Sequence, residues 1–505
     1  MMNGGTTDNF EKKPFTPPVV IKPKYELEKR DIIFSLLCLA ISIIAVILVL
    51  WGGFKIGFTI SYIIFFAVMS VFLYKKENKP DAFSCTCGVL SVISSFVYGY
   101  SGNSSVNTYL FIIMFFLSAL WFASLCGIKD NGKDFGTVSL SFSTVFGESF
   151  GNIDKACRSL LDSKNEKLKS FSKVFVGILC ALPALVIIIP LLASADGAFE
   201  GLLDYVGENI GELILQIIIG IILAPFVFSY GLGMRKNEYK PKDKAEMKGL
   251  DNVYVISFLS VLALVYVAYL FSQLAYFFDA FKGIMPDEFI PSAYARRGFF
   301  EMSIIAGINF VIIYSALVFK NKEKASKVIS IISTFIILFT LFLISTAIAK
   351  MVLYIQNFGM TVLRLTTSGF MVFLAIVFIA LIFRCFNKKT PVLKTAFIAA
   401  TCVLLIFGFG NVNRVVADYN VYAYKIGHLK SIDISTLAKQ GTSGVPALYD
   451  IYKTLPEYRA DARKKLENMY TKKYLKEREA GDWNVTDQIA YDILEKFAEE
   501  TNLKK

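Results

Sequence analysis

Long apolar runs alternate with short polar connections along most of the chain. Each run is near the roughly 20 residues that a helix needs to cross about 30 Å of hydrocarbon. Because lipid offers no partner to backbone N–H and C=O groups, we expect every run to be a helix. The eleven predicted spans are about 32–52, 57–74, 82–101, 108–127, 173–195, 212–232, 252–278, 299–319, 328–349, 365–385 and 392–410.

The polar segments divide the chain into five predicted parts, and the fold class they predict is all-α. It is a polytopic transmembrane bundle followed by a small helical extramembrane domain, in which Asn484 is a predicted helix cap. The parts are a disordered cytoplasmic tail (1–31), a four-span N-terminal bundle (32–127), a cytoplasmic connecting loop (128–172), a seven-span core (173–410) and a helical extracytoplasmic domain (411–505).

The basic residues predict which side of the membrane each connection occupies. The tail and the even-numbered connections together hold 31 Lys and Arg residues, whereas the odd-numbered connections hold six. This alternation is the positive-inside pattern. It predicts a cytoplasmic N-terminus and, after eleven spans, an extracytoplasmic C-terminus. The formal net charge of +12 is therefore explained by topology, and no nucleic-acid partner is predicted.

Composition argues against the common enzyme classes. The chain is 55% hydrophobic and only 19% charged, and its eight cysteines show no disulfide framework. His428 is the only histidine, Cys85 and Cys87 form an isolated C-x-C pair, and no phosphate-binding glycine motif occurs. We therefore predict no catalytic residues, no metal site and no cofactor, and we favour a non-enzymatic protein.

The stretch YARRGFFE at 294–301 places three charges just before the eighth span, on the predicted outer face. Glu301 follows Arg297 by four residues, so the two can pair on one helix face. One interpretation is anchoring, with the arginines reaching lipid phosphates. The other is a ligand or gating site, in which Glu301 holds Arg297 and leaves Arg296 to meet an anionic group. Asn309, further in, indicates a helix side turned toward protein.

A second outer segment, KMVLYIQNFGMTVLR at 350–364, adds two cations beside an aromatic ring. Lys350 and Tyr354 are one turn apart, Gly359 can end the helix, and Arg364 opens the next span. The simple interpretation is a tight helical hairpin with cations at the interface. The alternative is the second wall of the polar site. Arg296 and Arg364 would then meet an anionic group, or the start of the outer domain near Asn411 and Asn413. A guanidinium suits an anionic group because it binds carboxylate or phosphate through two hydrogen bonds.

Polar and aromatic residues also line one side of the seventh span. Tyr266, Tyr269, Gln273 and Tyr276 fall within an arc of about 80° at 100° per residue. An unpaired amide in lipid costs a few kcal/mol, so Gln273 needs a partner. The stripe is expected to face the bundle interior, either as packing or as part of a transport path that includes Tyr269 and Gln273.

Three stretches together resemble a bacterial family of multi-pass membrane proteins catalogued as a domain of unknown function. They are YARRGFFEM at 294–302, LYIQNFGMTVLRL at 353–365 and NVNRVVADYNVYAY at 411–424, and the likeness covers roughly residues 170–450. The resemblance implies many apolar spans followed by a polar helical segment, in a bacterial inner membrane. It transfers no catalytic residues.

Three functions stay open at this point. The first is a non-enzymatic envelope component that senses or scaffolds through an outward-facing polar site, and the second is a small-molecule or ion transporter. The third is a membrane enzyme acting on a lipid-linked substrate. The expected partners are the lipid bilayer and either an anionic ligand or an envelope protein.

Overall fold

The computed structural model describes most of the chain outside the tail and the long fourth connection. It describes residues 28–51, 53–102, 104–128, 134–148, 188–196, 211–236, 251–281, 291–319, 326–475 and 481–503, and the single positions 153, 170, 173, 177, 181 and 184. At 104–105, 272–281, 291–300 and 472–475, and at a few single positions, only the backbone is described.

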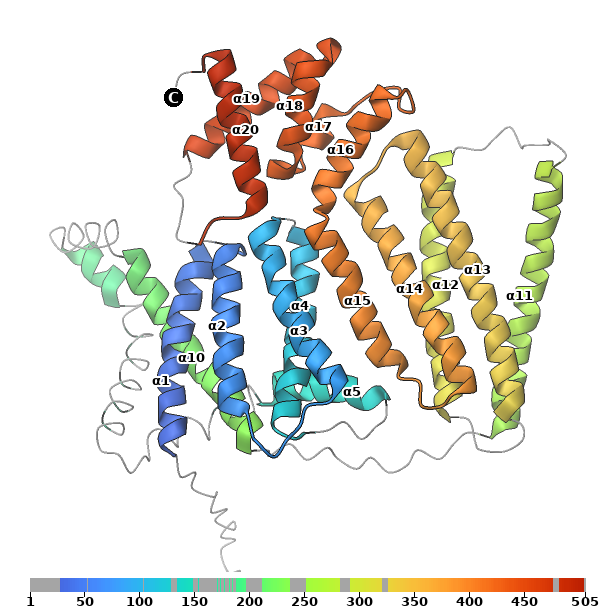
Figure 1. Cartoon of the computed structure of the whole chain (residues 1–505), viewed down its shortest axis with the longest axis horizontal. Helices are drawn as coiled ribbons and strands as arrows, with labels where there is room; N and C mark the ends of the chain where they lie inside the picture. The colour runs from blue at the N-terminus through green and yellow to red at the C-terminus, as the bar shows by residue number, and fades with distance from the viewer. Residues whose placement is uncertain are drawn as a thin grey trace, which may run out of the picture.

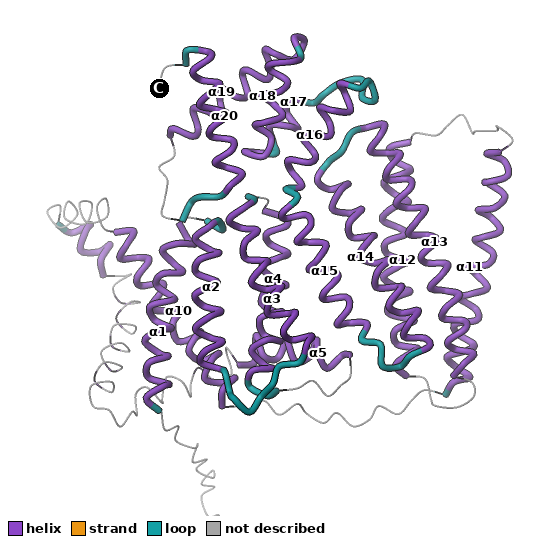
Figure 2. The backbone as a smooth tube through the Cα atoms, viewed as in Figure 1, coloured by secondary structure: helices purple, strands orange, loops and turns teal. Residues whose placement is uncertain are grey.

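Every regular element in these residues is a helix, as Figure 2 shows, and ten of the helices are long and apolar enough to cross a membrane. The all-α polytopic fold predicted from the sequence is therefore confirmed. The ten helices coincide with ten of the eleven predicted spans. The remaining span, 173–195, lies mostly outside the described residues.

The first group of helices packs around a core rich in phenylalanine (Figure 1). Its members are α1 (Lys29–Val46), η1 (Ile47–Trp51), α2 (Ile56–Leu73), α3 (Ala82–Tyr100), α4 (Ser104–Leu125), α5 (Asp134–Phe142), η2 (Ser143–Glu148) and α10 (Glu212–Lys236). Phe34 of α1 stacks on Phe72 of α2 with 3.6 Å between ring centroids, and Phe228 of α10 packs beside Phe34. Thus α10, which the sequence division places in the seven-span core, lies against α1.

The second group comprises α11 (Asn252–Phe281), α12 (Pro291–Phe319), α13 (Ser326–Phe358), α14 (Val362–Phe386) and α15 (Val392–Phe409). Its core is mainly aliphatic, with Ile336 fully buried, and also contains the fully buried ring of Phe378. The helix α15 connects the two groups, because Gly408 lies against Val97 of α3 so closely that an added Cβ would be 2.5 Å from that side chain. The bundle is therefore continuous from α10 to α11 (Figure 1).

A small helical domain follows α15 and lies at one end of the bundle (Figure 1). It consists of α16 (Val412–Lys425), α17 (Ile434–Ala438), η4 (Gly441–Gly444), α18 (Val445–Thr454), η5 (Pro456–Tyr458), α19 (Arg459–Leu475) and α20 (Val485–Thr501). Leu448, Leu466 and Phe497 are buried at its centre. The predicted cap is confirmed, since Asn484 accepts a hydrogen bond from the backbone N–H of Asp487 at the start of α20.

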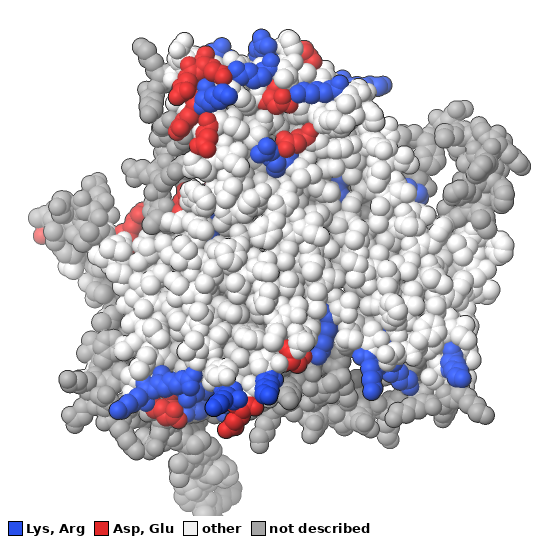
Figure 3. All heavy atoms as spheres, in the orientation of Figure 1, with Lys and Arg blue, Asp and Glu red and all other residues white. Residues whose placement is uncertain are grey.

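On the face drawn in Figure 3, charged side chains gather toward the two ends of the molecule, and a largely uncharged band lies between them. At the end opposite the C-terminal domain, the fully buried Asp31 of α1 accepts a hydrogen bond from Arg235 of α10 at 2.8 Å. Arg30 donates to the carbonyl of Phe72 at 2.7 Å, and Arg235 lies over the ring of that residue. These contacts tie α1, α2 and α10 together where they leave the apolar band.

Candidate functional site

The C-terminal domain is fastened to the bundle by a largely buried ion cluster at the start of α2. Lys55, the residue before α2, pairs with Asp482 and, at 2.7 Å, with Oδ2 of Asp487. Burial alone lowers the pKa of Lys55, but hydrogen bonds and attraction to both carboxylates raise it above its ordinary value. A cation at a helix N-terminus is unfavourable by itself, and two carboxylates at this position offset the helix dipole.

Backbone hydrogen bonds run beside the ion cluster. The N–H groups of Ile56 and Gly57, which have no acceptor within their own helix, donate to the carbonyls of Trp483 and Gly481 at 3.0 and 3.3 Å. Gly481 has φ of +87°, and a Cβ there would lie 2.8 Å from the carbonyl oxygen of Leu48. A glycine is therefore required for the segment before α20 to approach the bundle this closely.

Asn411, between α15 and α16, adds a second set of hydrogen bonds between the bundle and the C-terminal domain. It adopts the left-handed conformation with φ of 47°, donates from Nδ2 to Oγ1 of Thr486 at 3.0 Å and accepts from Ser443 at 3.1 Å. Thr486 donates to the carbonyl of Tyr100, the last residue of α3, at 2.8 Å. We call Lys55, Asn411, Asp482, Thr486 and Asp487 the clamp.

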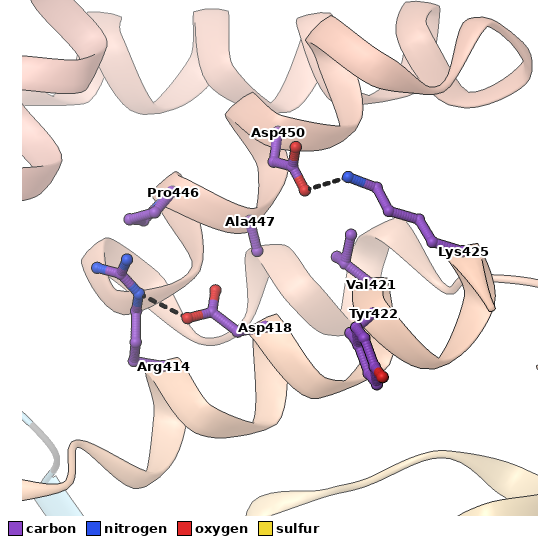
Figure 4. Close-up of a pocket in the computed structure, with 8 residues that line it drawn as sticks. All are labelled: Arg414, Asp418, Val421, Tyr422, Lys425, Pro446, Ala447 and Asp450. Carbon is purple, nitrogen blue, oxygen red and sulfur yellow. Dashed lines mark hydrogen bonds and ion pairs between the residues drawn. The ribbon is translucent and has the colours of Figure 1, made fainter.

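A groove of about 300 Å³ separates α16 from α18 in the C-terminal domain (Figure 4). Its lining residues are Arg414, Asp418, Val421, Tyr422, Lys425, Pro446, Ala447 and Asp450. Arg414 donates from Nε to Oδ2 of Asp418 at 2.9 Å, and Lys425 pairs with Oδ2 of Asp450 at 2.7 Å. Figure 4 shows Val421 and Ala447 between the two ion pairs. The groove thus has an apolar centre and both signs of charge at its borders.

A third polar cluster lies inside the second group of helices. Tyr266 of α11 donates to Oδ1 of Asn309 of α12 at 2.6 Å, and Asn309 donates to Oγ1 of Thr340 of α13 at 2.9 Å. Thr340 donates in turn to the carbonyl of Ile336 within its own helix. Asn309 is fully buried, which confirms the prediction that its side of the helix faces protein. The three polar side chains bind three spans to one another.

The structure brings together two residues of the predicted outer site. The guanidinium of Arg364 lies 4.1 Å from the ring centroid of Tyr354, a cation–π contact. Its Nη1 donates to the carbonyls of Phe358 and Gly359, at the end of α13. Gly359 has φ of +77°, as expected of a residue that ends a helix. Arg364 therefore already has partners within the turn between α13 and α14.

Of the other predicted site residues, the structure describes the side chains of three and leaves those of three undescribed. Glu301 is exposed near the start of the apolar part of α12, and Lys350 is half-buried on α13. Tyr269 packs edge-on against Phe339, with 5.9 Å between ring centroids. The side chains of Arg296, Arg297 and Gln273 lie outside the described part of the chain, so the outer polar site as a whole stays a prediction.

Sequence analysis missed the clamp and the groove. Lys55 is one of the six basic residues of the odd-numbered connections, and nothing in the local sequence connects it with Asp487. The groove had one detectable signal, the i, i+4 spacing of Arg414 and Asp418 on a predicted helix. Among the residues that the structure describes, no three His, Cys, Asp or Glu side chains lie close enough to hold a metal ion.

The ten apolar helices and the helical domain at one end of them define a multi-pass integral membrane protein. Residues 85–451 match the family model described as Domain of unknown function (DUF4153). This match spans well over half of the chain, so the chain belongs to that family, and the resemblance noted from the sequence is confirmed. No curated protein and no solved structure matches the chain.

Proposed function

We propose that this protein is a non-enzymatic membrane scaffold or sensor in which the C-terminal helical domain is a rigid extension of the bundle and recognises a partner outside the membrane. The observation that supports this proposal is the clamp. It connects the start of α2, the end of α3 and the end of α15 with α20 of the domain. A domain fixed at several points transmits its position to several spans.

The physical chemistry of the clamp favours one docked arrangement over many. The side chains of Asp482 and Asp487 are only 6% and 10% exposed, so separating them from Lys55 leaves two largely buried carboxylates without their cation. Directional hydrogen bonds through Asn411 and Thr486 allow little sliding. A flexible tether would need none of these contacts.

Hydrogen exchange tests the rigid connection. We expect the amides of Ile56 and Gly57 to exchange slowly in the intact protein in nanodiscs, because they donate across the interface. A Lys55→Met variant should accelerate their exchange, while a Lys425→Met variant should leave it unchanged. Rapid exchange of both amides in the unaltered protein would refute a rigid extension.

The orientation is also part of the proposal: a bacterial plasma membrane, with the N-terminus in the cytoplasm and the C-terminal domain outside. Support comes from the Lys and Arg residues of the bundle itself, which on the face drawn in Figure 3 lie mainly at the end away from the domain. In a cysteine-free background, an impermeant thiol reagent should label a cysteine at position 460 and spare one at position 242. Labelling of position 242 alone in intact cells would reverse the orientation.

A transporter is the second candidate, because the buried cluster of Tyr266, Asn309 and Thr340 lies among spans. Polar side chains inside a membrane bundle often mark substrate paths. A transport path requires this cluster to open, whereas a scaffold keeps it closed. Cysteine accessibility at position 309 from the aqueous phase would favour transport, and full protection would favour the scaffold.

A further inference from the structure

The charges of the α16–α18 groove are arranged in a way that selects for a particular class of ligand. Two cations, Arg414 and Lys425, and two carboxylates, Asp418 and Asp450, border it, so their formal charges cancel. A simple anion that approaches Arg414 meets Asp418 beside it, and a simple cation that approaches Asp450 meets Lys425. A molecule with both signs of charge avoids both repulsions.

The two ion pairs can exchange partners at low cost. The side chains of Arg414 and Asp418 are 38% and 50% exposed, and those of Lys425 and Asp450 are 34% and 45% exposed. Ion pairs in water contact contribute little to stability, so a ligand group can replace one partner without leaving a buried charge. This differs from the clamp, where the carboxylates are enclosed.

The geometry of Arg414 suits an anionic group. Its bond to Asp418 uses Nε, and Figure 4 shows the two Nη groups on the side of the guanidinium away from Asp418, one of them toward Pro446. Two parallel N–H groups bind a carboxylate or phosphate in a bidentate manner. Asp450 lies at the other end of the groove and can accept an ammonium group in place of Lys425. Val421 and Ala447, between the ends, offer apolar contact to the linking atoms.

We propose that the α16–α18 groove binds a small zwitterion, with its anionic group on Arg414 and its ammonium group on Asp450. The volume of about 300 Å³ is at the lower end of the range for ligand sites, which limits the ligand to a small molecule or a headgroup. An extended dipeptide, whose charges lie at most about 7 Å apart, and a phosphoethanolamine headgroup both have this chemistry. The proposal deepens the proposed function, since it names what the C-terminal domain recognises.

The test is a titration of the full chain in nanodiscs. The probes are L-alanyl-L-alanine and the phosphodiester glycerophosphorylethanolamine, together with N-acetyl-L-alanyl-L-alanine, which has no ammonium group, and L-alanyl-L-alanine amide, which has no carboxylate. We expect a zwitterion to bind at least about tenfold more tightly than either capped peptide, a difference of about 1.4 kcal/mol. Preference for glycerophosphorylethanolamine identifies a lipid headgroup, and preference for the dipeptide identifies a peptide; either supports the proposal.

Variants then locate the binding. Arg414→Gln and Asp450→Asn should each weaken zwitterion binding about tenfold. The matched control is Arg463→Gln, because Arg463 and Glu467 form an exposed i, i+4 pair at 2.8 Å outside the groove, and this change should have no effect. Equal binding of capped and uncapped peptides, equal loss in the control, or no binding up to about 10 mM would overturn the proposal. The exchange of Ile56 and Gly57 separately reports whether the rigid extension fails.

Discussion

The clamp and the α16–α18 groove use the same chemistry in different surroundings. Lys55 lies 2.7 Å from Asp487, and Lys425 lies 2.7 Å from Asp450. The carboxylate of Asp487 is 10% exposed, whereas that of Asp450 is 45% exposed. Distance therefore does not distinguish the two pairs, and burial does. A pair enclosed by protein fixes a structure, and a pair in water contact is available for exchange.

The hydrogen-bond environment makes the same distinction. Asp487 also accepts from Thr442 at 2.6 Å and from Nδ2 of Asn484 at 2.9 Å, so its two oxygens are held from several directions. In the groove, Lys425 and Asp450 bridge two helices at the surface of the domain. The carboxylate of Asp487 is therefore held by several donors at once, whereas the pair of Lys425 and Asp450 remains accessible from solvent.

The largest effect is expected from Lys55→Met. This change leaves Asp482 and Asp487 as buried charges without their cation, which typically costs about 3–5 kcal/mol. The loss of stability is measured by heating the purified protein and using proteolysis of the C-terminal domain to monitor its unfolding. The matched Lys425→Met change breaks an exposed pair and should cost less than about 1 kcal/mol. Equal losses in the two variants would remove the distinction between the pairs.

A smaller loss is expected from Asn309→Leu, which tests whether burial has the same importance within the membrane. The change removes the acceptor of Tyr266 and the donor to Thr340. Hydrogen bonds between membrane helices average below 1 kcal/mol, so we expect a loss of about 1–2 kcal/mol for both together. Thermal stability in detergent measures it, with Asn357→Leu on the exposed end of α13 as the control. An unchanged or raised stability would show that the cluster does not bind the spans.

The Arg364→Lys change should have an effect of about 1 kcal/mol. Lysine keeps the charge but lacks the planar fork that contacts the carbonyls of Phe358 and Gly359 and stacks on Tyr354. The thermal midpoint in detergent should fall slightly, with insertion into the membrane unaltered. Full retention of stability would support the anchoring interpretation of this arginine.

The smallest effect is expected from raising the pH from 7 to 10. The pKa of Lys55 is raised above its ordinary value of 10.5 in the folded protein, so the contribution of the clamp is complete below that value and is lost only as the pH rises through the folded pKa. Exchange of the Ile56 and Gly57 amides, corrected for intrinsic base catalysis, should therefore show constant protection across this range. Loss of protection below pH 10 would contradict a charged Lys55 in the clamp.

Some parts of the structure can be predicted from the sequence, and others cannot. Apolar length predicts spans directly, and a glycine such as Gly359 or a cap such as Asn484 marks a helix end locally. The clamp is not local, since Thr486 and Tyr100 are 386 residues apart. Likewise, α10 packs on α1 although the sequence places it next to the later spans, because periodicity identifies helices and not their neighbours.

Of the predicted site residues, Tyr354 and Arg364 lie on either side of Gly359, so their contact forms within a single connection between helices. The groove is not recognisable from the sequence, because it forms only when α18 packs against α16 around the core that contains Leu448 and Val421. All eight residues of the groove lie within the segment 85–451 that matches the family, whereas Lys55 and Asp487 lie outside it. Local chemistry was thus predictable, and chemistry formed by tertiary packing was not.

The most direct test of the clamp is a pair of double-mutant cycles on the full chain. One cycle combines Lys55→Met with Asp487→Asn, and the other combines Lys425→Met with Asp450→Asn, with the free energy of unfolding measured in detergent for each variant. We predict a coupling energy of at least about 2 kcal/mol for the first pair and less than about 1 kcal/mol for the second. Equal coupling energies, or a larger value for Lys425 and Asp450, would contradict the clamp as the joint between domain and bundle.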